Sequence, residues 1–165
     1  FRLYNSQKNI DLFVNNGIYT KEEVNSRMEI HLMDYSRTIN IEARTMLEMT
    51  HKTIIPAVVN YSEDLLRTLS KKRKFADLKL NTYTEEKLLE TVSTLLGKLY
   101  QSVEVLEKNL ELAYTTLSPL ERAESYYHGV ASEMVTMRQL LDQLEVHIPE
   151  DLWEIPSYTK LLLEY

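Results

Sequence analysis

Residues 20–35 decide the fold, and they read Thr20-Lys-Glu-Glu23-Val24-Asn-Ser-Arg27-Met28-Glu-Ile-His-Leu32-Met-Asp-Tyr35. Thr20 followed three residues later by Glu23 is a capping box, in which the two side chains satisfy free amides at the start of a helix. Apolar residues then recur every three or four positions, which is the spacing of one helix face and not of a strand. The stretch therefore begins a helix with one continuous apolar face.

The apolar face continues well beyond Tyr35, through Ile39, Ala43, Met46, Ile54, Val58, Tyr61, Leu65 and Leu69. Pro56 falls inside this pattern, and a proline within a helix removes a hydrogen bond and bends the axis. Because the apolar spacing resumes after Pro56, a kinked continuation is favoured over a break. We predict one long helix over residues 21–70, kinked near Pro56.

Shorter helices flank this long one. Residues 6–15 form a short helix with Ile10, Phe13 and Val14 on its apolar side, and Gly17 ends it. Residues 85–117 carry a sustained heptad-like face, made of Leu88, Val92, Leu95, Leu99, Val103 (or Ser102), Leu106, Leu110, Ala113 and Leu117. Gly97 lies inside that helix and is expected to allow a close contact between helices.

A further helix over 119–146 starts at Ser118, with Pro119 at its first position and Glu121 as a capping glutamate. Its apolar face consists of Ala123, Tyr127, Val130, Met134, Met137, Leu141 and Leu144. The short turn before it makes an antiparallel hairpin with the preceding helix. In the tail, 149–165, Pro149 and Pro156 each open a helical turn, and Trp153 is expected to close one end of the bundle.

These elements predict an all-α fold: residues 1–165 form one helical domain, an antiparallel bundle of three long helices with short helices at both ends. The chain has only three glycines and four prolines, too few turn residues for an all-β domain of this size. The long helix exceeds its partners in length, so part of its apolar face is expected to project as a docking surface.

Composition narrows the class of partner. The chain has no cysteine and a net charge of −6, and the acidic excess lies in residues 118–165, which carry three basic and nine acidic side chains. This balance argues against nucleic acid as a partner, and no apolar run approaches the roughly 20 residues of a membrane span. Without cysteine or a signal peptide, a cytoplasmic location is expected, and the start at Phe1 suggests a piece of a longer chain.

Chemical motifs point away from catalysis in this segment. A di-iron bundle needs two Glu-x-x-His pairs, and only Glu48 and His51 have that spacing. The three glycines are too far apart for a phosphate-binding loop. We therefore predict no catalytic, cofactor-binding or metal-binding residue here.

The basic run Lys71–Lys74 begins a predicted linker over residues 71–83. Its four cations could form a phosphate-binding or nuclear-localisation patch. Alternatively, they could lie at a helix end, where positive charge complements the helix dipole.

Several ordered motifs nevertheless resemble the C-terminal helical region of type III glutamine synthetases. They are Ser26-Arg27-x-Glu29-Ile30, Tyr35, Asn40-Ile41-Glu42-Ala43, Thr45-Met46, Pro56-Ala57-Val58, Met137-Arg138, Leu144-Glu145 and Trp153-x-x-Pro156-x-Tyr158. The resemblance covers residues 5–70 and 130–165, whereas 71–117 is similar only in being helical. Arg44 stands where an apolar residue is expected, and Ile155 where a proline or small residue is expected.

The resemblance implies a parent enzyme that makes glutamine from glutamate, ammonia and ATP through γ-glutamyl phosphate, with magnesium or manganese ions. It implies a cytoplasmic dodecamer in which this segment packs on the catalytic domain of the same chain and on neighbouring subunits. Four polar residues within the motifs are candidates for such an interface: Arg27, Glu29, Asn40 and Glu42. Their alternative role is ordinary pairing on the helix surface, for which Glu23 and Arg27 have the right spacing.

A second function class stays open on the residues alone. The chain could be a scaffold or adaptor bundle that binds protein partners through the apolar face of the long helix. Methionines on that face are adaptable and suit a partner-binding groove as well as a core.

Overall fold

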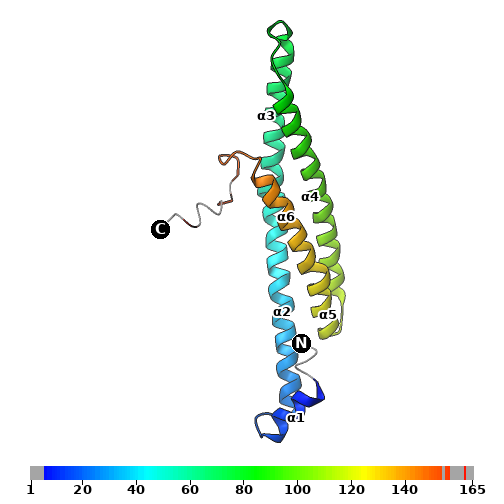
Figure 1. Ribbon diagram of the computed structural model, residues 1–165. Helices are drawn as coiled ribbons and strands as arrows, with labels where there is room; N and C mark the ends of the chain where they lie inside the picture. The colour runs from blue at the N-terminus through cyan, green and yellow to red at the C-terminus, as the bar shows by residue number, and fades with distance from the viewer. Residues whose placement is uncertain (1–5, 154, 157–161, 163–165) are drawn as a thin grey trace. The chain divides into compact units, whose positions relative to one another are not determined.

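The computed structural model describes residues 6–153, 155, 156 and 162, and this part of the chain contains no strand. Its elements are α1 (Gln7–Asn15), α2 (Lys21–Met49), η1 (Thr50–Ile54), α3 (Ile55–Lys74), η2 (Ala76–Leu78), α4 (Tyr83–Thr115), α5 (Pro119–Ser125), η3 (Tyr126–Ala131) and α6 (Ser132–Glu145) (Figure 1). Two of these, η1 and η3, are π turns, and η2 is a 3₁₀ turn. The prediction of an all-α fold is confirmed.

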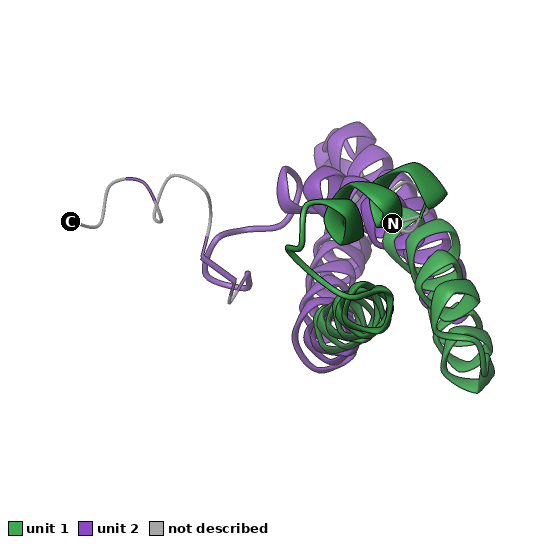
Figure 2. Cartoon of the chain, turned by 90° about the horizontal axis from the view of Figure 1, so that it is seen from below, with its two compact units in different colours: residues 1–43, 106–132 green, residues 44–105, 133–165 purple. Residues whose placement is uncertain are grey.

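The chain divides into two compact units (Figure 2). Unit 1 comprises residues 1–43 and 106–132, and unit 2 comprises residues 44–105 and 133–165. Unit 1 therefore holds α1, the first part of α2, the end of α4, α5 and η3. Unit 2 holds η1, α3, most of α4, α6 and the tail.

The start of α2 has the geometry that its sequence predicts. The backbone amide of Thr20 donates to the Glu23 carboxylate at 2.7 Å, and the Glu23 amide donates to the Thr20 hydroxyl at 3.2 Å. Just before it, Gly17 has a φ of 63°, and its amide and that of Ile18 return to the carbonyls of Val14 and Phe13. This pair of bonds is a Schellman motif, so α1 ends and α2 begins where expected.

Pro56 is the second residue of α3, just beyond the π turn η1, within an uninterrupted helical run. A proline ring clashes with the carbonyl four residues earlier and supplies no amide proton. In a π turn the amides reach carbonyls five residues back, and the Ile55 amide bonds to the Thr50 carbonyl in this way. The wider turn accommodates the proline, and the helix continues through Pro56 as predicted.

Two predicted boundaries move. The long helix ends at Lys74 rather than at residue 70, so the basic run belongs to the last turn of α3 and not to a linker. Helix α4 ends at Thr115, and Leu117, predicted to face the core, is 90% exposed. The physical reason is that α5 starts at Pro119, with the Ser118 carbonyl accepting from the Arg122 amide at 2.8 Å, which leaves residues 116–118 for the turn. Ser118 stands at the N-cap position, but its side chain makes no capping hydrogen bond there.

The core of unit 1 forms between α2 and α5. Met28, Leu32 and Ala123 are buried together, with Tyr35 and Leu120 packed against them. In the next turn Tyr126 is 2% exposed while Tyr127, the predicted core residue, is 61% exposed. The prediction of Tyr127 as the core residue is wrong, because steps of three and of four residues both fit the helix period and the step from the buried Ala123 is three residues, to Tyr126. Val14 of α1, also predicted inward, is exposed.

In unit 2, α3 and α4 form a hairpin that extends beyond the end of α6 (Figure 1). Its core is made of fully or almost fully buried side chains from these helices: Ile54, Val58, Val92, Leu99, Val103, Met137 and Leu144. Ser102 donates a hydrogen bond to Glu133 between α4 and α6. Gly97 does not mark a close contact, because a Cβ atom built there meets nothing within 4 Å.

The tail folds back at Pro149, whose carbonyl accepts hydrogen bonds from the amides of Leu152 and Trp153. Trp153 and Ile148 are buried. Trp153 lies beside Ile54 and the last turns of α6, within the length of the long helix, and not at an end of the bundle as predicted. The helical turn predicted after Pro156 falls largely outside the described residues. Among the described helices, none combines the length and apolar character that crossing a membrane requires.

Candidate functional site

The four candidate interface residues all lie on α2 in unit 1, but they do not form one cluster. Arg27 and Asn40 are thirteen residues apart, which is about 20 Å along an α-helix. Arg27, Glu29 and Glu42 are exposed, and Asn40 is half-buried. The structure therefore separates them into two pairs: Arg27 and Glu29 near the start of α2, and Asn40 and Glu42 near residue 43, where the first segment of unit 1 ends.

Arg27 has an intramolecular contact of its own. Its guanidinium lies over the Tyr19 ring, 4.4 Å from the centroid, which is a cation–π arrangement. Tyr19 in turn contacts Phe13 of α1, with ring centroids 5.6 Å apart. Arg27 thus fastens α1 and its turn to the start of α2.

The charges at this helix start act on Glu23. The pKa of Glu23 is lowered mainly by the hydrogen bond from the Thr20 amide, then by the bond from the Thr20 hydroxyl, and in a small part by the charge of Arg27. Each of these interactions favours the ionised carboxylate. Glu23 is therefore held as an ionised carboxylate at the start of α2, where it caps the helix.

Glu42 acts on a neighbouring tyrosine. The pKa of Tyr35 is raised, first by its burial, then by Tyr127 and the charge of Glu42. Burial and a nearby anion both disfavour a phenolate, so Tyr35 stays protonated at neutral pH. Its ring belongs to the apolar cluster of unit 1, and its role there is packing.

The outward face of α2 carries large apolar side chains that the sequence reading overlooked. Ile30, Met33 and Ile41 are 49%, 47% and 58% exposed. Their spacing places them on the side of the helix opposite Met28 and Leu32. The charged residue Arg37 lies between Met33 and Ile41 on this side of the helix. Because of this interruption the outward apolar spacing is weaker than the inward one, and the sequence pattern alone did not indicate it. We call Ile30, Met33 and Ile41 the outer stripe.

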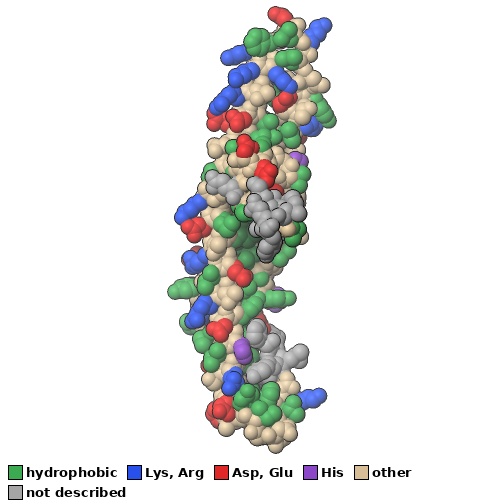
Figure 3. Space-filling model, turned by 90° about the vertical axis from the view of Figure 1, so that its left-hand side faces the viewer, with side chains coloured by type: hydrophobic (Ala, Val, Ile, Leu, Met, Phe, Trp, Pro, Cys, Tyr) green, Lys and Arg blue, Asp and Glu red, His purple; other side chains and the backbone are tan. Residues whose placement is uncertain are grey.

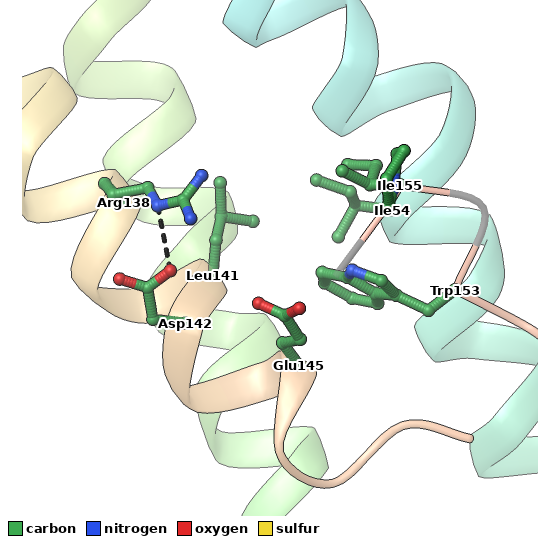
Figure 4. A pocket seen from close by; sticks show the side chains of 8 residues that line it. Ile54, Arg138, Leu141, Asp142, Glu145, Trp153 and Ile155 are labelled. Atoms are coloured by element: carbon green, nitrogen blue, oxygen red, sulfur yellow. Dashed lines mark ion pairs between the residues drawn. The ribbon is translucent and has the colours of Figure 1, made fainter. Parts of the chain in front are cut away.

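A pocket of about 200 Å³ lies in unit 2 where the tail returns to the helices (Figure 4). Its apolar wall is made of Ile54, Leu141, Trp153, Ile155 and Pro156. Its polar side comes from α6, where Arg138 pairs with Asp142 at 2.8 Å and Glu145 points toward Trp153 (Figure 4). We call it the tail pocket.

The end of the α3–α4 hairpin is held by ion pairs. Lys72 contacts Glu85 at 2.5 Å and donates to the Asn81 carbonyl at 3.0 Å, and Arg73 contacts Glu86 at 3.1 Å. The Lys72 hydrogen bond is the main reason why the pKa of Glu85 is lowered. This arrangement agrees with the helix-end reading of Lys71–Lys74, since two of the four cations serve the turn itself.

Within the described ranges, no three His, Asp or Glu side chains are grouped so that they could hold a metal ion. Glu48 of the single Glu-x-x-His spacing pairs with Lys52 on the surface of the helix. Three surface features stand out among the described residues: the outer stripe, the tail pocket and the hairpin end.

Comparison with known proteins supplies the family. Residues 1–73 match the family model described as "Glutamine synthetase C-terminal domain". Nearly the whole chain, 95%, also aligns at 35% identity with a glutamine synthetase of Butyrivibrio fibrisolvens. The chain belongs to the glutamine synthetase C-terminal domain family.

Two further relatives extend this assignment. A glutamine synthetase of Bacteroides fragilis is 22% identical over 96% of this chain, and a type-3 glutamine synthetase of Dictyostelium discoideum is 24% identical over 96%. Because these alignments cover 95–96% of the chain, they include most of the helices beyond residue 73, where the family model ends. The chain spans 22% of the length of each of these relatives.

Proposed function

We propose that this chain is the non-catalytic C-terminal helical domain of a glutamine synthetase, and that it packs on the catalytic domain or on neighbouring subunits. The observation that carries this proposal is the alignment of nearly the whole chain with 22% of the length of three proteins named glutamine synthetase. The proposed parent joins glutamate and ammonia at the expense of ATP, with magnesium or manganese. Its proposed setting is a cytoplasmic homo-oligomer, by resemblance a dodecamer.

The outer stripe supports the packing role. Three large apolar side chains on the solvent side of one helix cost hydration free energy when left exposed, and burying each would contribute about 1.5–3 kcal/mol. They lie within the part of the chain that the family model covers, residues 1–73. The motif residues Ile30 and Ile41 belong to the outer stripe, whereas the polar motif residues beside them suit the rim of an interface.

The first experiment separates a structural domain from an enzyme. The purified chain and the full polypeptide that contains it are assayed side by side for ATP-dependent γ-glutamyl transfer with magnesium or manganese. We expect turnover only in the full polypeptide. Turnover by the chain alone, at a rate above a heat-inactivated blank, would contradict a non-catalytic role.

The second experiment tests the packing surface in the full polypeptide. Ile30→Lys and Ile41→Lys together are expected to disrupt assembly, measured by light scattering after size exclusion. The control is Leu112→Lys, which alters a side chain that is 64% exposed on α4 and outside the outer stripe. Equal assembly of the two variants would remove the outer stripe from the interface, and partner capture without any synthetase subunit would favour the adaptor function.

A further inference from the structure

The end of the α3–α4 hairpin, residues 71–83, presents apolar and basic side chains together. Phe75, Leu78, Leu80 and Tyr83 are between 46% and 65% exposed. Lys71, Lys74 and Lys79 are exposed between them, and no carboxylate in the described part of the chain is paired with these three lysines. In Figure 3 the upper end of the visible face carries Lys and Arg side chains intermixed with hydrophobic ones and with a few Asp or Glu side chains. Asp77 is also exposed in this segment, so the lysines outnumber the single unpaired acid. We call this surface the hairpin tip.

The hairpin tip is built as an ordered turn. Lys72 bridges the Asn81 carbonyl and Glu85, and the Asn81 side chain accepts a hydrogen bond from the Tyr83 amide at 2.8 Å. Lys79 adopts a φ of 46°, a left-handed conformation that costs free energy in a non-glycine residue. A turn held in this way presents its outward side chains at a low entropy cost on binding.

The tail pocket has the complementary chemistry. Its wall is apolar and includes the face of Trp153, while Asp142 and Glu145 place two carboxylates beside one guanidinium, Arg138. A Lys ammonium on an aliphatic stem suits such a site, since the stem packs on the apolar wall and the charge meets the carboxylate and the indole ring. At about 200 Å³ the pocket is smaller than the 300–1,000 Å³ usual for small-molecule sites, and fits a protruding side chain.

The hairpin tip of a chain cannot enter its own tail pocket. Both belong to unit 2, and Ile54 in the pocket wall is separated from Lys74 by twenty residues of uninterrupted helix. That length of helix spans about 30 Å. The two surfaces can meet only when they belong to different copies.

We propose that the hairpin tip of one copy docks in the tail pocket of a second copy, with Lys74 or Lys79 directed to Glu145. The contact is heterologous, since different surfaces of the two copies meet, and it joins copies head to tail in a ring or an open array. It rests on the surfaces of unit 2 alone and does not depend on the proposed enzyme function. The proposal also gives a binding role to Lys74 of the basic run Lys71–Lys74, of which only Lys72 and Arg73 form ion pairs within the turn.

The experiment measures self-association of the purified chain by analytical ultracentrifugation over a range of concentrations. We expect concentration-dependent association that weakens at high salt, because the contact is charged. We expect the double variant Lys74→Glu with Lys79→Glu to raise the dissociation constant about tenfold or more. The single variant Glu145→Lys should raise it by a similar factor. Mixing the two variants should restore association, since their charges are again opposite.

The matched control is Lys98→Glu, a charge reversal at an exposed lysine of α4 that lies outside the hairpin tip. This variant should associate like the unaltered chain. Because the natural chain has no cysteine, a Lys79→Cys chain mixed with a Glu145→Cys chain provides a second readout, a disulfide between copies under oxidation. A chain that stays monomeric throughout and forms no such disulfide overturns the proposal. The proposal is also overturned if the Lys74→Glu, Lys79→Glu variant self-associates like the unaltered chain but no longer binds phosphatidylserine vesicles. The hairpin tip would then bind an anionic membrane surface and not a second copy.

Discussion

Leu106 lies on α4 in unit 1 and is completely buried, so Leu106→Ala tests the core directly. The substitution removes three carbon atoms, and at about 0.8 kcal/mol per buried methylene the transfer loss is about 2.4 kcal/mol. The cavity left behind adds to this loss, and buried Leu→Ala changes cost about 2.7–5 kcal/mol in total. For a chain of this size each kcal/mol lowers the melting temperature by about 2–4 °C. We expect a decrease of about 5–20 °C.

The matched control is Leu112→Ala, which makes the same chemical change on the same helix and in the same unit, at a side chain that is 64% exposed. Both variants have the same small change in helix propensity, so their difference isolates burial. We expect Leu112→Ala to alter the free energy of unfolding by no more than about 0.5 kcal/mol. Thermal unfolding followed by circular dichroism at 222 nm measures both. Equal destabilisation by the two substitutions would refute the packing of unit 1 described here.

The other predictions concern helix starts, turns and charge. Gly97→Ala should stabilise the chain by up to about 1 kcal/mol, since the position is helical and open and alanine is the better helix former. Gly17→Ala should destabilise the chain, because φ is positive at this position. Urea unfolding measures the free energy of unfolding of both variants. Thr20→Ala should cost about 0.5–2 kcal/mol through loss of the N-cap, measured in the same way. The pKa of Glu85 is lower in the folded chain, so its pair with Lys72 stabilises the fold above the ordinary Glu pKa of 4.5, and this contribution disappears as the pH falls through the lower folded value. An acid titration of Lys72→Met should therefore show a weaker loss of stability below pH 4.5 than the unaltered chain shows.

Local signals in the chain predicted most of the helices because they act over a few residues. The capping box at Thr20 and Glu23 formed as expected, since both partners lie within one turn. The glycine stop at Gly17 depends only on backbone conformation. The three- and four-residue spacing identified Val24, Met28 and Leu32 as core residues, and all three are buried. The family motifs were equally readable from sequence, because they are ordered strings of residue types.

Other features needed the packed structure. Thr50 is completely buried, and its hydroxyl donates to the Met46 carbonyl at 2.8 Å, so a polar residue belongs to the core in a way that an apolar pattern cannot predict. Which of Tyr126 and Tyr127 is buried depended on which side of this helix packs against other helices. Arg27, Glu29, Asn40 and Glu42 lie in two pairs about 20 Å apart along α2, so they do not form one cluster. Their role at an interface stays a prediction.

The amino-acid sequence alone determined that this protein is helical, where its helices begin, and which family it resembles. These properties follow from hydrogen bonds and apolar spacing within single helices. Only the tertiary structure decided how Pro56 is accommodated, since the π turn before it forms in a helix that packing already holds. The tertiary structure also decided that Ile54, Glu145 and Trp153 share one pocket, because ninety-nine residues of chain separate the first from the last and only the folded chain brings them together.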